Sequence, residues 1–274
     1  MDFIDGISRF CFGASYTVAL LLELARLIWP RPALRVVSLG FGIAGLIAHT
    51  IYLLAQRPSL ASQGGSMLFL TWILAVFYLY GTVHHRQLAW GVFVLPVVVG
   101  LVLLTIVFPA GTEPSWLSVL DALRGERFWG LVHGGLLVLA AVGGCVGFVA
   151  SVMYLVQARR LRLKAPPPAG AKLPSLERIE LMNRRAVNIA FPLLTAGALV
   201  GVALMVQRPD SYAGWTDPKV IGTVLLWVVF AVLLYLRYGV HMRGRQLAVW
   251  TIIAFVLQVL TLASSHSAVQ GGMP

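Results

Sequence analysis

Charged residues are scarce in this sequence, and their scarcity excludes a soluble globular enzyme. Asp, Glu, Lys and Arg make up 11% of the 274 residues, whereas 59% of the residues are hydrophobic and the mean hydropathy is +0.85. A soluble domain carries about a quarter of its residues as charged side chains, which cover its surface. This composition therefore indicates a membrane protein, although its net charge of +11 needs a separate explanation.

Cysteine is almost absent, and its placement excludes several kinds of site. Cys11 and Cys145 each stand alone inside an apolar stretch, with no CxxC, CxxCH or Cys/His cluster nearby. The sequence therefore offers no zinc cluster, no dithiol switch and no covalent haem attachment on this chain. We expect both cysteines to be small packing residues.

The sequence contains many long apolar stretches. Eight of them approach or exceed the roughly 20 residues that a helix needs to cross a bilayer. Only helices satisfy their own backbone hydrogen bonds when an isolated segment spans lipid. We predict an all-α integral membrane protein, a single polytopic domain over residues 1–274. Its transmembrane helices are predicted at approximately 9–29, 33–54, 66–83, 88–108, 128–157, 186–206, 218–238 and 247–265.

The positive charges fall mainly on one side of these spans. Fifteen of the 21 Lys and Arg residues, with three acids, lie in one set of loops, and six cations with seven acids lie in the other. Cytoplasmic loops carry the excess of Lys and Arg, so both termini are predicted on the outer side of a bacterial cytoplasmic membrane. The net charge thus reflects orientation and not binding to nucleic acid.

Two further patterns concern helix packing. Gly143-x-x-x-Gly147 and Gly197-x-x-x-Gly201 lie within apolar stretches, where small residues let helices approach closely. On the inner side, the apolar residues of 176–182 recur at helical spacing among charges. That pattern predicts a short helix on the inner membrane surface, separate from the span at 186–206.

Three of the six histidines lie toward the outer side of the predicted spans. His49 is late in the second span, His133 is early in the fifth, and His266 follows the last. Each alone is more often a hydrogen-bonded structural residue, but three on one side of so apolar a chain favour a shared site. Two histidines from different helices can ligate haem iron axially, and a porphyrin needs apolar walls.

The outer loops contain residues suited to such a group. The aromatic candidates are Trp116, Phe128, Trp129, Tyr212 and Trp215, and the cations that would pair with haem propionates are Arg124, Arg127, Arg208 and Lys219. The interfacial belt of Trp and Tyr explains the aromatic residues equally well. A second polar feature, Glu23 and Arg26, lies three residues apart in the first span, so the two can form an ion pair or serve a proton relay.

The segment Leu173–Arg185, followed by Ala190–Gly197 and Gly201, resembles the cytochrome c assembly family. This haem-handling group includes the CcsA/ResC, CcmC and HemX proteins. The similarity is strongest over residues 133–266. Further matches are His133, Met153–Gln157, Asp217–Lys219, Leu226–Trp227, Gly244–Arg245, Ala254–Phe255 and Ser264–His266, and Ala48–Leu53 resembles the HemX-like branch.

The resemblance implies a haem site at the outer face. His133 and His266 match the histidines that ligate haem iron, and Trp215, Asp217 and His49 are the other expected binding residues. The haem would be haem b, held non-covalently, and no catalytic residue is assigned. The loop 212–219 contains a single tryptophan, and Tyr235 stands where the CcsA type often has an intramembrane histidine. Both departures resemble the HemX-like branch.

The resemblance also implies a function. The protein would bind haem at the outer face for delivery to apocytochrome c, at most as the haem-delivery component of a cytochrome c haem lyase complex. A second membrane subunit and apocytochrome c would be its partners, besides membrane lipid. The alternatives are a HemX-type non-catalytic regulator of tetrapyrrole synthesis and a small-molecule transporter. A transporter predicts repeated halves, and no internal repeat is visible in the sequence.

Overall fold

The computed structural model describes residues 9–60, 62–84, 90–108, 110, 126–164, 173–207, 215–242 and 244–264. Its regular elements are all α-helices. They are α2 (Arg9–Ile28), α3 (Pro32–Gln56), α4 (Gln63–His84), α5 (Trp90–Val107), α7 (Glu126–Arg162), α8 (Leu176–Gln207), α9 (Pro218–Tyr238) and α10 (Arg245–Ala263). All eight are long and apolar enough to cross a membrane. The prediction of an all-α membrane protein is therefore confirmed.

One predicted element is wrong. The short surface helix expected around residues 176–182 is instead the beginning of α8, which runs without a break from Leu176 to Gln207. Ile179 and Asn183 are buried, and the Asn183 side chain donates a hydrogen bond to the Gly147 carbonyl of α7 over 3.0 Å. The apolar stripe of this segment thus faces a neighbouring helix and not the membrane surface.

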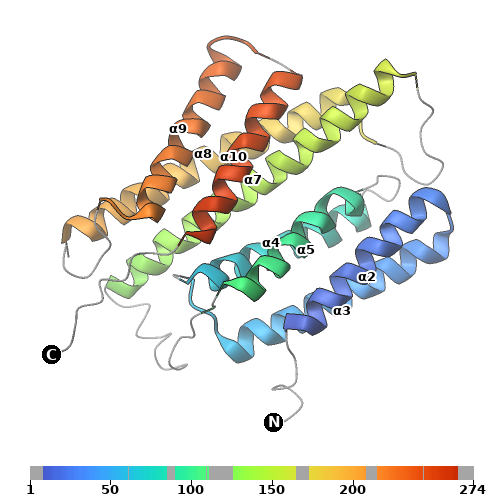
Figure 1. The fold of residues 1–274 in the computed structure, drawn as a ribbon, viewed down its shortest axis with the longest axis horizontal. Coiled ribbons are helices and arrows are strands. Elements are labelled where there is room, and N and C mark those ends of the chain that lie inside the picture. Colours follow the sequence, from blue (N-terminus) through green and yellow to red (C-terminus); the bar gives the residue numbers. More distant parts are fainter. Residues whose placement is uncertain are drawn as a thin grey trace.

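The helices form two groups of four that meet along α7 (Figure 1). In the first group α2 packs antiparallel to α3, and α4 and α5 lie between this pair and α7. In the second group α8 follows α7 along most of its length, while α10 packs on α7 and α9 packs on α8 and α10. Two apolar cores result. The larger one fills the first group and continues to α7, and the smaller one lies among α7, α8, α9 and α10.

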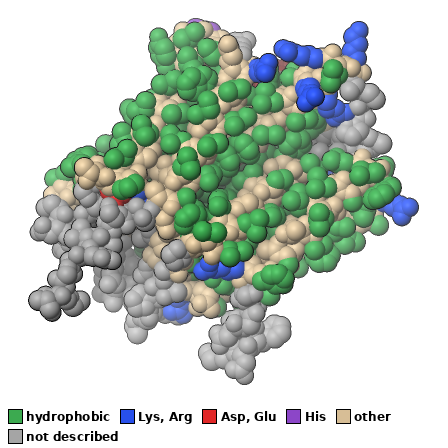
Figure 2. Space-filling model, in the orientation of Figure 1, with side chains coloured by type: hydrophobic (Ala, Val, Ile, Leu, Met, Phe, Trp, Pro, Cys, Tyr) green, Lys and Arg blue, Asp and Glu red, His purple; other side chains and the backbone are tan. Residues whose placement is uncertain are grey.

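The exposed surface of the helices is largely apolar, as expected for helices surrounded by lipid. Figure 2 shows hydrophobic side chains along the helices and Lys and Arg side chains gathered near the end of α7. We call this end of the molecule the basic end. Its described cations include Arg31, Arg159, Arg160, Arg162, Lys164, Arg178, Arg184, Arg185, Arg237 and Arg245. The opposite end, where α7 and α9 begin and where α8 and α10 finish, is called the His133 end.

Candidate functional site

His133 lies near the start of α7 and is held by the end of α8. Its Nδ1 atom is 2.7 Å from the Gly197 carbonyl oxygen. A carbonyl can only accept, so Nδ1 carries the proton and Nε2 is left with its lone pair. Histidines that ligate metals almost always donate their other N–H to a carboxylate, a carbonyl or water, which fixes the ring in this way. The ring is half-buried.

The glycines of α8 make this position of the ring possible. A Cβ atom placed on Gly201 would lie 2.6 Å from Cε1 of His133, which is far inside contact distance. A Cβ atom on Gly197 would lie 2.9 Å from a Leu137 methyl carbon, one turn further along α7. The small residues of the Gly197-x-x-x-Gly201 pattern therefore admit His133 as well as close helix packing.

Other elements converge on the same end of the bundle. The Gln63 side chain, at the start of α4, donates a hydrogen bond to the Ala263 carbonyl at the end of α10 over 2.5 Å. Leu60 lies against Gly134, the residue that follows His133. The end of α10 and the start of α4 are thereby fixed beside the start of α7.

The start of α9 adds a capped helix terminus to this end. Asp217 is 1% exposed, and its carboxylate accepts a hydrogen bond from the backbone N–H of Lys219 over 2.8 Å. This is an N-cap, followed by Pro218 at the first helical position. The ammonium group of Lys219 lies within electrostatic reach of His133. Trp215, by contrast, is 62% exposed, so its ring is available to a ligand or to the interface.

Removing this cap is expected to loosen the start of α9. We expect Asp217→Ala to lower the free energy of unfolding by about 1 kcal/mol, the usual cost of losing an N-cap oxygen. Asp217→Asn keeps an oxygen that can accept from Lys219 and should retain most of the stability. Thermal unfolding of the detergent-solubilised variants measures the difference. Equal melting temperatures for Ala and Asn would show that the cap does not hold α9 in place.

A cavity lies among α7, α8, α9 and α10, and Lys219 at the start of α9 is one of the residues that line it. Its volume is about 60 Å³, smaller than the roughly 300–1,000 Å³ of most small-molecule sites, so a porphyrin would occupy it only in part. The lining residues are Leu137, Ala140, Ala141, Ala190, Leu194, Lys219, Thr223, Leu226, Phe230, Gln258, Thr261 and Leu262. The walls are mainly apolar, with a single ionic group, the Lys219 ammonium. The walls thus suit an apolar part of a molecule that also carries a carboxylate.

His49 occupies a different part of the structure. It is fully buried between α2 and α3, stacked on Phe12 with ring centroids 4.2 Å apart, and its Nδ1 is 3.4 Å from the Tyr16 hydroxyl. Its Nε2 has no hydrogen-bonding partner among the described residues. In the described part of the chain, α3 and α7 have no Cα atoms within 8 Å of each other. His49 and His133 therefore lie in separate groups of helices.

Several predicted residues lie outside the described part of the chain. These are His266, Trp116, Tyr212, Arg124 and Arg208, together with the side chain of Arg127. Phe128 and Trp129 are exposed at the start of α7, with ring centroids 5.5 Å apart. Of the four predicted propionate partners, Lys219 is the one that the structure places in the cavity.

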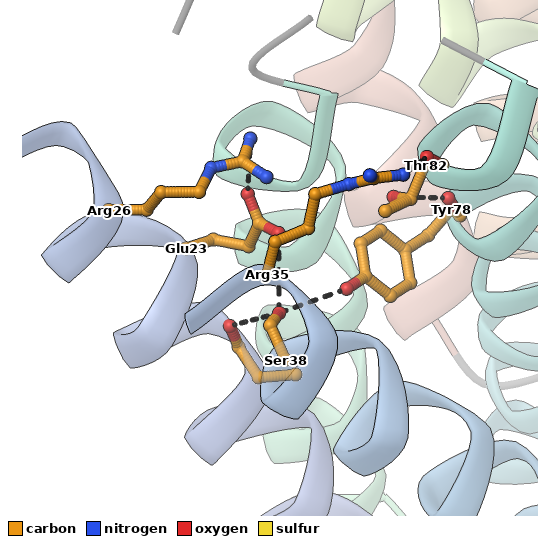
Figure 3. Close-up of polar contacts among 7 residues, drawn as sticks. Glu23, Arg26, Arg35, Ser38, Tyr78 and Thr82 are labelled. Atoms are coloured by element: carbon orange, nitrogen blue, oxygen red, sulfur yellow. Dashed lines mark hydrogen bonds and ion pairs between the residues drawn. The ribbon is translucent and has the colours of Figure 1, made fainter. Parts of the chain in front are cut away.

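The expected pair of Glu23 and Arg26 belongs to a second polar cluster, toward the basic end of the first helix group (Figure 3). The two side chains form an ion pair of 3.0 Å and are 1% and 7% exposed, respectively. Ser38 of α3 donates to the Glu23 carboxylate over 3.3 Å and lies 3.3 Å from the Tyr78 hydroxyl of α4. The pair is therefore enclosed by helices, and this cluster ties α2, α3 and α4 together.

Two buried polar residues of the second group were not singled out from the sequence. Gln258 of α10 donates to the Ala141 carbonyl of α7 over 3.0 Å and lines the cavity. Asn183 donates to the Gly147 carbonyl and to Ser151. A lone amide in an apolar helix is a recognisable sequence signal, because a polar group in lipid needs a partner. Both amides sit on helix faces that pack against α7.

Comparison with known proteins identifies the family. Residues 61–271 match the family described as "Cytochrome C assembly protein", which covers most of the chain and every helix from α4 to α10. The chain belongs to the cytochrome c assembly protein family. The matched region contains His133, Asp217, Lys219 and the cavity that Lys219 lines. The resemblance seen in the sequence is therefore confirmed.

Individual relatives agree with this family membership. The chain is 23% identical over 255 residues to "Cytochrome c biogenesis protein CcsA" of Gloeobacter violaceus, an alignment covering 75% of each chain. It is 24% identical over 281 residues to the protein of the same name from a Synechococcus strain, covering 78% of this chain and 79% of the relative. For the Chlamydomonas reinhardtii protein of that name, the identity is 22%, and the coverage is 86% and 67%. No solved structure matches the chain.

Proposed function

We propose that this multi-pass membrane protein holds haem at its His133 end and delivers it to apocytochrome c during cytochrome c biogenesis. One observation carries the proposal. His133 donates its Nδ1 proton to the Gly197 carbonyl, and its Nε2 is thereby kept as a free base near an apolar cavity that contains Lys219. The family and the CcsA relatives support the biological setting.

The residues present fit haem b bound without a covalent link. His133 would ligate the iron through Nε2, and Lys219 would pair with a propionate. Leu137, Leu194 and Phe230 would supply apolar contact with the porphyrin. His266 would be the second axial ligand, since it follows the end of α10, which is fixed beside α4. The exposed Trp215 would cover the porphyrin, and Asp217 would position Lys219 by capping α9.

The chain's own contribution to the reaction is to bind and orient its cargo. Haem supplies vinyl groups, to which the thiols of an apocytochrome add. Neither cysteine of this chain serves that step, because Cys145 is fully buried and Cys11 lies on α2, in the other helix group. The thiols would therefore come from the apocytochrome, with a second membrane subunit presenting it. On this account the protein is the haem-delivery component of a lyase complex and has no catalytic residue of its own.

The orientation follows from the charges. The basic end would face the cytoplasm, so the His133 end and both termini would lie on the outer side of a bacterial cytoplasmic membrane. His49 would lie at a similar depth in the first helix group. Its unpartnered Nε2 would make it a second candidate ligand, away from His133.

One observation favours a second function, that of a HemX-type regulator. Residues 212–219 contain Trp215 as their single tryptophan, and Tyr235 replaces an intramembrane histidine. Such a protein would control the level of an early enzyme of tetrapyrrole synthesis through its basic end. It would not deliver haem.

A deletion strain separates the two functions. If the protein delivers haem, deletion should remove most holocytochrome c while leaving haem precursors near their normal level. Haem staining of membrane proteins and chromatographic measurement of porphyrin precursors give both quantities from the same cells. Normal cytochromes c with altered precursors would support the regulator and contradict the delivery function.

A further inference from the structure

A second cleft lies at the basic end of α7, α8, α9 and α10, far along the bundle from His133. The space inside it is about 10 Å³, which admits about one water-sized group such as a single oxygen of a larger anion. The lining residues are Ala150, Ser151, Tyr154, Ile179, Glu180, Asn183, Arg237, Gly244, Leu247 and Ala248. Polar groups from three helices thus meet in a region that the haem site does not use.

Arg237 is the cation that lines this cleft, and one of its two terminal nitrogens already has a hydrogen-bond partner. Its Nη2 donates to the Asn183 side-chain oxygen over 2.6 Å. The amide nitrogen of Asn183 in turn donates to Gly147 and Ser151 of α7 and to Thr251 of α10. Asn183 is thereby fully engaged, and Arg237 is held in a defined position.

The second terminal nitrogen of Arg237, Nη1, has no hydrogen-bond partner among the described residues. Nη1 of Arg237 is buried and forms no hydrogen bond with any described residue. A buried charged donor without an acceptor is costly, because it has lost its hydrogen bonds to water and gained none in the protein. An acceptor that enters the cleft would remove this cost.

The charges around the cleft favour an anionic acceptor. The carboxylate of Glu180 lines it, and both Glu180 and Arg184 act electrostatically on Arg237. One acid therefore stands against two guanidinium groups, that of Arg237 in the cleft and that of Arg184 near it. The exposed basic residues of this end add to the positive potential.

The position of the cleft relative to the membrane surface indicates the source of the anion. Arg237 lies in the last turn of the spanning helix α9, between Tyr235 and Tyr238, which are 68% and 51% exposed. Exposed tyrosines at the end of a spanning helix mark the level of the lipid headgroups. Basic pockets between transmembrane helices on the cytoplasmic side are suited to anionic headgroups.

We propose that this cleft binds the phosphate of an anionic phospholipid, with one phosphate oxygen accepting from Nη1 of Arg237. The lipid would join the end of α9 to α7, α8 and α10 through Arg237 and Asn183. Charge-assisted bonds between Arg and phosphate are among the stronger hydrogen bonds in proteins. This binding is independent of the proposed haem site.

The test compares lipid binding by the full-length protein and three variants. Phosphatidylglycerol and phosphatidylcholine with identical acyl chains are titrated into the detergent-purified protein, and native mass spectrometry measures the bound fraction. We expect the wild type to bind one phosphatidylglycerol about tenfold more tightly than phosphatidylcholine, which corresponds to about 1.4 kcal/mol. Arg162→Gln removes an exposed cation of the same end and should keep this preference.

Changes at Arg237 should abolish the preference. Arg237→Gln removes the charge. Arg237→Lys keeps a charge that can donate to the Asn183 oxygen, so this variant should stay folded. Its single nitrogen cannot also occupy the position of Nη1, so the two lipids should bind nearly alike. Thermal unfolding verifies the fold of each variant. A tenfold preference that survives in Arg237→Lys, or is lost equally in Arg162→Gln, would overturn the proposal.

Inorganic phosphate distinguishes the source of the anion. The lipid assignment predicts that millimolar phosphate neither displaces phosphatidylglycerol nor raises the melting temperature of the lipid-free protein. Stabilisation by phosphate alone that disappears in Arg237→Lys would instead assign the cleft to a free anion and overturn the lipid.

Discussion

Replacing His133 with alanine should remove most of the haem from the purified protein. The substitution deletes the proposed Nε2 ligand, whose ring is held by the Gly197 carbonyl. Loss of an axial ligand is expected to lower haem content about tenfold or more, the change that corresponds to 1.4 kcal/mol of binding free energy or more. Pyridine haemochrome analysis of equal amounts of protein measures it, and holocytochrome c in the cells should fall in parallel.

His84 provides the matched control. Its Nδ1 lies 3.0 Å from the Tyr80 carbonyl, so its ring is fixed in the same tautomer, but it is exposed at the opposite end of the bundle. His84→Ala should leave both haem content and cytochrome c unchanged. Equal losses in the two variants would mean that haem binds elsewhere or that histidine removal acts through the fold.

Breaking the Glu23–Arg26 pair should cause the largest loss of stability. Glu23→Met leaves the Arg26 guanidinium inside the helix group without its carboxylate. Removal of one partner from a buried ion pair typically costs about 3–5 kcal/mol. Unfolding of the protein in mixed micelles with increasing denaturing detergent measures this free energy.

The double variant Glu23→Met with Arg26→Met tests the cause of that loss. Removing both charges leaves no unpaired ion, and the replacement of a buried pair by apolar residues is often neutral or stabilising. We therefore expect the double variant to recover most of the stability. Glu177→Met, at an exposed position of α8, should change it little. A double variant as unstable as Glu23→Met would show that the hydrogen bond from Ser38, and not the unpaired charge, is what matters.

The helices could be predicted from the sequence because the bilayer imposes their length. Most of the predicted ends lie within a few residues of the observed ones, as for α2 and α9. The continuation of α8 to Leu176 could not be predicted in the same way. The sequence pattern of a charged amphipathic segment is the same whether its apolar stripe faces lipid headgroups or another helix. Here Ile179 and Asn183 face α7, and that contact decides the outcome.

The end of the bundle where His49 and His133 lie could be predicted from the sequence, but their lateral positions could not. Charge asymmetry and span order put His49 and His133 toward one end, and the structure then separates them between two helix groups. Hydropathy contains no information about which helices are neighbours. The role of Gly201 is similar, because its sequence pattern predicts close packing but does not show that the His133 ring fills the space.

The absorption spectrum of the detergent-purified protein tests the haem site most directly. The spectrum is recorded oxidised and reduced, before and after haem supplementation, for the wild type and for His133→Ala combined with His266→Ala. We expect a Soret band and reduced α and β bands of a bis-histidine b-type haem in the wild type, and their loss in the double variant. A wild-type protein without a Soret band even after supplementation, or a double variant with an unchanged spectrum, would contradict it.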